Sequence, residues 1–134
     1  MPAKLLDDHA RPKPMNLNYL FPHAADVKTY QPGEVIFAEG APADCLYVLL
    51  DGEVRLDSRG IEFWRVAPGE IFGEMALVDG RPRNSNAVAK AVSRVAPVDE
   101  KKFSAIVQHA PAFALMLVRT VARSLRATDE TLAG

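Results

Sequence analysis

Residues 68–87 read PGEIFGEMALVDGRPRNSNA, and this stretch decides the fold. Gly73 lets the backbone come close to a bound group, because glycine has no Cβ. The residues from Gly73 to Leu77 have the pattern of a first helical turn, whose unpaired N–H groups attract an anion. Arg83 offers a planar fork of donors that can grip two phosphate oxygens. The stretch therefore predicts a loop that binds a phosphate group.

Two motifs in this stretch, FGEMAL at residues 72–77 and Pro-Arg at residues 82–83, have a characteristic spacing. In this order they resemble the phosphate-binding cassette of the cyclic-nucleotide-binding domain family, which includes the catabolite activator protein and the regulatory subunit of protein kinase A. The likeness extends to YQPGEVIFAEGAPADCLYVLLDGEVRL at residues 30–56, which is similar to the first half of the same roll. The resemblance implies cAMP or cGMP as the ligand. We refer to residues 68–87 as the cassette.

The resemblance also implies roles for single residues. Arg83 would anchor the cyclic phosphate, and Glu74 would accept a hydrogen bond from the ribose 2′-hydroxyl while its carboxylate partners Arg83. In a purely structural interpretation, Glu74 and Arg83 form only an ion pair that closes the loop, and Gly73 is a turn glycine. The residues expected to contact the ligand are Phe72, Gly73, Glu74, Met75, Ala76, Arg83, Asn84 and Ser85.

Two residues after the arginine depart from the family pattern. Members usually carry Ser, Thr or Ala and then Ala, whereas this chain has Asn84 and Ser85. A Thr at the first position favours guanine and a Ser or Ala is common in cAMP binders, so Asn84 leaves the choice of base open. Ser85 would either hydrogen-bond the phosphate or crowd it. The alternative function is therefore a degenerate member that binds no nucleotide and serves as a dimerisation or docking module.

The sequence around the cassette predicts a mainly β protein with flanking helices. Residues 27–98 consist of short runs rich in Val, Ile, Phe and Tyr, separated by Gly and Pro. We expect an eight-stranded antiparallel β-roll, similar to a jelly roll, with a short helix in the phosphate-binding loop and helices at the C-terminus. Val35 and Phe37 are expected on one face of a strand, and Asp51-Gly52 is expected to form a hairpin turn between two strands.

The chain, at 134 residues, has the length of one domain and divides into three parts. Residues 1–25, rich in proline, predict a tail and one short helix. Residues 26–110 form the expected nucleotide-binding roll. Residues 111–134 form the expected lid or dimerisation helix, which follows a shorter helix interrupted at Pro111.

The last helix carries an apolar and a polar pattern. Apolar residues at alternating spacings of three and four indicate the seam of a two-stranded coiled coil, and hence a homodimer, although the same stripe would also suit packing on the roll. The seam residues are Val118, Val121, Leu125, Thr128 and Leu132. The candidates to contact the base are Arg123, Ser124, Arg126 and Thr128, unless this polar face is merely solvated.

Composition argues against several other functions. The net charge is −1 and no basic run is present, so direct DNA binding by this chain is not expected. His9, His23 and His109 lack metal-ligand spacing, which predicts no metal, no other cofactor and no enzyme activity. No apolar run suits a membrane span or a secretory signal, which favours a cytoplasmic protein. A family transcription factor would need a DNA-binding domain after the last helix, so we expect either a stand-alone sensor that acts through an unidentified effector protein or a domain cut from a kinase, channel or regulator.

Overall fold

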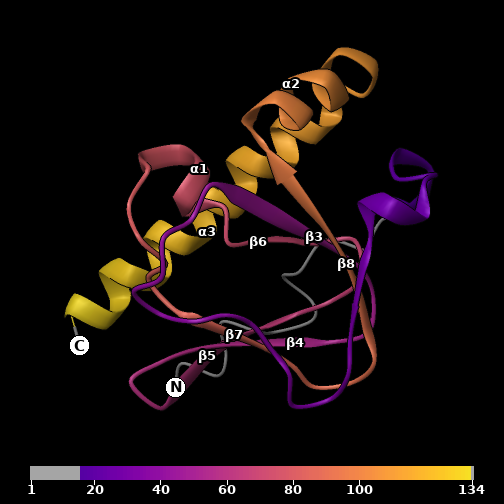
Figure 1. The fold of residues 1–134 in the computed structure, drawn as a ribbon. Helices are drawn as coiled ribbons and strands as arrows, with labels where there is room; N and C mark the ends of the chain where they lie inside the picture. The colour runs from indigo at the N-terminus through magenta and orange to yellow at the C-terminus, as the bar shows by residue number, and fades with distance from the viewer. Residues whose placement is uncertain (1–15, 134) are drawn as a thin grey trace.

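The structure is a computed structural model that describes the backbone of residues 16–133 and the side chains of residues 16–126. Eight strands form two four-stranded antiparallel sheets, and helices lie along one side of them (Figure 1). The predicted eight-stranded roll with a short helix in the cassette and helices at the C-terminus is confirmed.

The elements run in the following order along the two sheets. The first sheet contains β1 (Lys28–Tyr30), β8 (Ser93–Asp99), β3 (Cys45–Asp51) and β6 (Ile71–Phe72), and the second contains β2 (Val35–Phe37), β7 (Asn86–Ala89), β4 (Val54–Ser58) and β5 (Ile61–Val66). The helices of the described residues are the 3-10 helices η2 (Asn18–Leu20) and η3 (Ala24–Asp26), followed by α1 (Met75–Asp79), α2 (Glu100–His109) and α3 (Ala112–Ala133).

An apolar core fills the space between the sheets, because alternate side chains of each strand point inward. At its centre the rings of Phe37, Tyr47 and Phe72 stack on one another, with centroids 5.4 to 6.1 Å apart. These residues come from β2, β3 and β6, so both sheets contribute to the stack. Gly73 and Arg83 of the cassette lie against the Phe37 ring of this stack.

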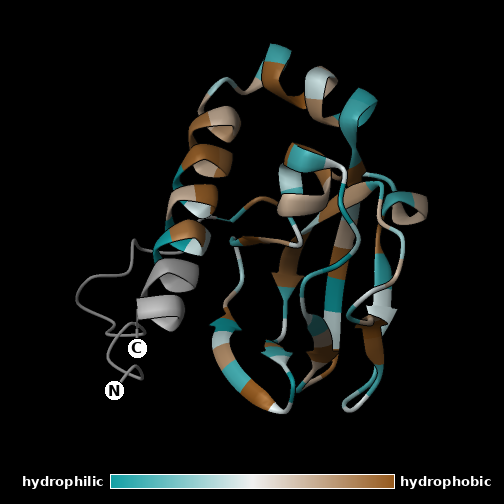
Figure 2. Ribbon diagram, turned by 90° about the vertical axis from the view of Figure 1, so that its left-hand side faces the viewer, coloured by the Kyte–Doolittle hydropathy of each residue, from teal (hydrophilic) through white to brown (hydrophobic). Residues whose placement is uncertain are grey.

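A second apolar cluster attaches the helices to the outer side of the first sheet. Leu17 and Phe21 from the N-terminal segment are buried in it together with Ile106 of α2 and Phe113 of α3. Figure 2 shows α3 as a long helix beside the roll, with hydrophobic positions along its length. In the described part of the chain, no helix combines the length and apolarity needed to cross a bilayer. Residues 1–15 of the predicted tail lie outside the described residues. Within residues 16–26 the chain forms the 3-10 helices η2 and η3, in the segment where a short helix was predicted.

The prediction of a hairpin at Asp51-Gly52 was wrong. β3 and β4 lie in different sheets, so this turn carries the chain around a corner from one sheet to the other. Gly52 has φ of 101°, and a Cβ there would collide with Ser93. The two-residue hairpin is instead Arg59-Gly60, where Ser58 of β4 pairs with Ile61 of β5 and both turn residues have positive φ.

The predicted alternation in β2 was also wrong. Val35 is exposed whereas Ile36 and Phe37 are both buried. The pairing of β2 with β7 shifts between Val35 and Phe37, as it does at a β-bulge. Because a bulge breaks the two-residue period, Val35 and Phe37 do not share a face.

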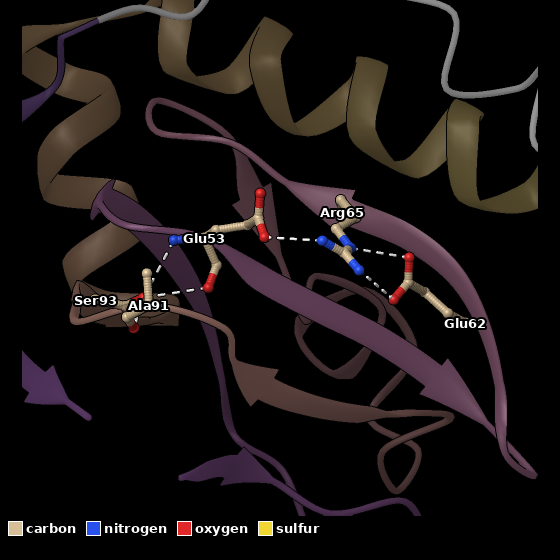
Figure 3. Close-up of polar contacts among 5 residues, drawn as sticks. All are labelled: Glu53, Glu62, Arg65, Ala91 and Ser93. Atoms are coloured by element: carbon tan, nitrogen blue, oxygen red, sulfur yellow. Dashed lines mark hydrogen bonds and ion pairs between the residues drawn. The ribbon is translucent and has the colours of Figure 1, made fainter. Parts of the chain in front are cut away.

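Side-chain contacts close the corner and brace the hairpin (Figure 3). The Ser93 hydroxyl accepts from the Glu53 N–H at 3.2 Å and donates to the Ala91 carbonyl at 2.8 Å, on the two sides of the corner. Arg65 of β5 bridges Glu62 and Glu53 at 2.9 and 3.0 Å. These ion pairs are exposed and contribute little stability. They connect β5 to Glu53, the residue before β4.

Candidate functional site

The part of the cassette between β6 and β7 begins with Gly73, which a residue with a side chain could replace only with strain. Gly73 has φ of 70°, in the left-handed region that side chains disfavour. A Cβ at this position would lie 2.8 Å from Arg83 Nη1 and 3.0 Å from the Phe37 ring. The missing side chain therefore makes room for the arginine of the cassette.

Arg83 is buried and lies on the aromatic stack. Its guanidinium carbon is 4.2 Å from the ring centroid of Phe37 and 5.4 Å from that of Tyr47. Nη1 donates to the Gly73 carbonyl at 2.9 Å, and Nη2 is 3.8 Å from Sγ of Cys45, which is half-buried. Nε finds no hydrogen-bond partner in the described part of the chain. Within residues 16–126 no carboxylate pairs with this cation, and a buried charge without a partner is costly.

The backbone of Arg83 is clamped by the loop between β2 and β3. The Gly40 N–H donates to the Arg83 carbonyl at 2.8 Å, and the Arg83 N–H donates to the Ala41 carbonyl at 2.9 Å. Asn86 secures the same loop, since its Oδ1 accepts from the Glu39 N–H at 2.8 Å. The arginine is thus held in place by neighbours from another part of the chain.

Glu74 is buried, with 5% of its surface exposed, and its carboxylate faces α3. The Ser124 hydroxyl donates to Glu74 Oε2 at 2.9 Å. Burial raises the pKa of Glu74, while the Ser124 hydrogen bond and the charges of Arg123 and Arg83 act in the opposite direction. The expected pairing of Glu74 with Arg83 is not formed, because the arginine faces Gly73 and Cys45 instead. The structural interpretation as a loop-closing ion pair fails for the same reason.

The helix α3 closes the site on the side of β5. The Arg123 guanidinium lies 3.9 Å from the ring centroid of Trp64 and 3.7 Å from the Glu70 carboxylate. Ser124, next along the helix, reaches Glu74. Of the four predicted base contacts, these two touch the roll, Arg126 is exposed, and the Thr128 side chain lies outside the described residues.

Sequence reasoning missed Trp64 and Glu70, although Trp64 is the single tryptophan of the chain and follows the alternation of β5.

The remaining predicted ligand contacts lie in the cassette and differ in how deeply they are buried. Phe72 is fully buried in the aromatic stack, and Ala76 and Ser85 are buried. Met75 is half-buried and Asn84 is exposed.

This arrangement, with a left-handed glycine turn, a buried arginine and a buried glutamate that contacts a C-terminal helix, agrees with a family comparison. The model of the cyclic nucleotide-binding domain matches residues 27–110. The chain belongs to this family. The resemblance seen in the cassette motifs is therefore confirmed over most of the roll.

Relatives within the cyclic nucleotide-binding domain family include bacterial regulators and kinase subunits. The chain is 32% identical over 120 residues to a CRP-like cAMP-activated global transcriptional regulator of Mycobacterium tuberculosis, which covers 82% of this chain and 54% of the relative. It is 38% identical over 82 residues to a cAMP-dependent protein kinase regulatory subunit of Aspergillus niger, covering 60% of this chain and 20% of the relative. The chain thus spans about half or less of the length of these relatives.

A solved structure shares the fold. The catabolite activator protein of Thermus thermophilus superposes with a TM-score of 0.70 at 27% identity, covering 99% of this chain and 62% of that structure. The helices at the C-terminus are included in this likeness, since nearly the whole chain is matched.

Proposed function

We propose that this chain is a cytoplasmic sensor that binds a cyclic nucleotide, cAMP or cGMP, in the cassette and couples binding to the position of α3. The observation that carries the proposal is the buried guanidinium of Arg83, which has no carboxylate partner and an unsatisfied Nε among the side chains of residues 16–126. A cyclic phosphate carries one negative charge and would neutralise this cation. The glycine at residue 73 keeps any side chain away from this cation, since a Cβ there would lie 2.8 Å from Arg83 Nη1.

The phosphate end of the site is organised around Arg83. The Phe37 ring orients the guanidinium, and the clamp from Gly40 and Ala41 holds its backbone. Charge-assisted hydrogen bonds from a fixed arginine to a phosphate are short and strong. Ser85, buried two residues after the arginine, would add its hydroxyl, while the exposed Asn84 would lie at the rim.

The ribose end is organised around Glu74. Its carboxylate is not consumed by Arg83 and would accept a hydrogen bond from the 2′-hydroxyl. Phe72, Met75 and Ala76 would complete this wall of the site through their backbone or side chains. A ribose hydroxyl is an effective partner here, because a buried carboxylate needs donors.

The base would extend toward α3, where Arg123, Ser124, Arg126 and Thr128 are its proposed contacts. A ligand can shift α3 only if it binds one position of the helix more tightly than another. In this proposal residues 26–110 bind the ligand and residues 111–134 respond, without catalysis and without DNA contact by this chain. The response would pass to an unidentified effector protein. The relatives support this view, since one is named as cAMP-activated and another as a regulatory subunit.

The outer face of α3 supports a homodimer. Phe113 and Thr120 are buried against the roll, whereas Leu115, Val118 and Leu125 on the other side are 49 to 61% exposed. Val118 and Leu125 belong to the predicted seam, so these two side chains are not covered by packing on the roll. A second copy of the helix would cover it.

Calorimetric titration of the full chain with cAMP and with cGMP tests the proposed function. We expect saturable binding with about one site per chain for at least one ligand, and no comparable binding of 5′-AMP, whose phosphate has a different charge and shape. Flat titrations with both cyclic nucleotides would reject the proposal in favour of the degenerate docking module.

A further inference from the structure

We propose that Ser124 of α3 is a positioning residue for ribose recognition: its hydroxyl holds one oxygen of the Glu74 carboxylate and leaves the other oxygen for the 2′-hydroxyl of the ligand. This inference rests on the proposed function and adds to it a helix residue that acts through Glu74. It makes recognition of a ribonucleotide, as opposed to its 2′-deoxy form, depend on α3.

The geometry places the Ser124 hydroxyl firmly at the carboxylate. Ser124 Oγ lies 2.9 Å from Glu74 Oε2, although the two residues are 50 positions apart in the chain. Its neighbours anchor this part of α3, since Thr120 is buried one turn earlier and Arg123 lies on the ring of Trp64. An ionised carboxylate has about four lone-pair sites on two oxygens. The Ser124 bond therefore orients Glu74 without exhausting its capacity to accept.

The same contact favours the ionised form of Glu74. Burial raises the pKa of this carboxyl group, and the Ser124 hydrogen bond is the largest of the effects that oppose the rise. The charged groups that act on Glu74 are Arg123 from α3 and Arg83 from the cassette. A carboxylate accepts from a hydroxyl more strongly than a protonated carboxyl group does. Ser124 thus orients the ribose acceptor and shifts its ionisation toward the carboxylate.

The test compares the full chain with Ser124→Ala and Ser124→Thr, using a cyclic nucleotide that the wild type binds and its 2′-deoxy analogue. Alanine is well tolerated in a helix, and thermal melting checks that the variant is folded. We expect Ser124→Ala to weaken ribonucleotide binding about tenfold, the order of one hydrogen bond to a charged group, with little change for the deoxy analogue. Ser124→Thr, which keeps the hydroxyl, should retain most of the wild-type affinity for the ribonucleotide.

A pH series separates positioning from a general structural effect. Because binding needs the carboxylate, affinity falls as pH falls through the pKa of Glu74. Without Ser124 this pKa is higher, so the fall should begin at a higher pH in Ser124→Ala. Carbon NMR of the Glu74 carboxyl group in the ligand-free chain, assigned with Glu74→Gln, should show the same displacement without any ligand.

The outcomes distinguish this inference from the proposed function. If the wild type binds neither cyclic nucleotide, the proposed function fails and the role of Ser124 in ribose recognition fails with it. If the wild type binds but Ser124→Ala loses both ligands equally, or keeps the pH midpoint of the wild type, only the positioning role is overturned.

Discussion

Ser124 Oγ donates to Glu74 Oε2 across 2.9 Å and joins the C-terminal helix to the cassette. No comparable bond links Glu74 to Arg83, the proposed phosphate anchor, within the described side chains. The two ends of the proposed site are therefore held differently. Arg83 is clamped by the roll itself, whereas Glu74 depends on α3.

Replacing Arg83 by alanine should weaken cyclic nucleotide binding by about 2–5 kcal/mol, because the phosphate would be left without its buried cation. Isothermal titration calorimetry measures the loss. Arg65→Ala is the matched control, since this arginine forms exposed ion pairs on β5. Retention of affinity in Arg83→Ala would place the phosphate anchor elsewhere.

Gly73→Ala should destabilise the chain more than Gly80→Ala. The two glycines have nearly the same φ, 70° and 69°, so both substitutions carry a left-handed penalty of about 1–2 kcal/mol. Only at Gly73 does a Cβ approach Arg83 and Phe37, which adds strain of about 1–3 kcal/mol. Urea unfolding of both variants measures the difference. Equal losses in the free energy of unfolding would mean that a Cβ at residue 73 does not strain Arg83 and Phe37.

Glu74→Gln should increase stability at neutral pH while weakening ribonucleotide binding. Burial raises the pKa of Glu74, so the folded state favours the protonated side chain. This contribution to stability is complete below the unfolded pKa and is lost as pH rises through the folded pKa. Glutamine keeps an acceptor for Ser124 and carries no charge. The gain in melting temperature over the wild type should therefore grow from acid to neutral pH. A gain that does not vary with pH would contradict a destabilising charge at this position.

Arg123→Ala should alter the fluorescence of Trp64, the single tryptophan, by removing the cation from its ring. The contact stabilises the docking of α3 by about 0.5–2 kcal/mol. Arg126→Ala, at an exposed position on the same helix, should leave the emission unchanged. If ligand binding moves α3, titration with the bound cyclic nucleotide should shift the wild-type emission. An invariant spectrum in all three proteins would contradict the docking of α3 on β5.

Val118→Glu combined with Leu125→Glu should abolish a homodimer without unfolding the roll. Both side chains are exposed, at 61% and 51%, so the charges meet solvent in a monomer but repel in a seam. Light scattering gives the mass, and Arg119→Glu is an exposed control. A wild type that stays monomeric at all concentrations would refute the dimer.

Local pattern was sufficient for much of the fold. The glycine and proline spacing predicted eight strands, and the change of period after Asp99 predicted the two final helices. It failed at β2 and at Gly52, because a bulge or a corner has the same local composition as a regular strand or a hairpin. Which turn joins which strands depends on pairing with distant residues such as Val88 and Ser93.

The sequence by itself determined the family and the cassette. The number of residues between Phe72 and Arg83 is set by the glycine turn and the one short helix that lie between them, so a local pattern is enough to recognise it. Only the tertiary structure decided the partners of the charged residues. Arg83 lies on Phe37 and beside Cys45 instead of pairing with Glu74, and Glu74 meets Ser124. Such contacts join segments far apart in the chain, and their energies depend on burial and distance, which no local pattern of residues encodes.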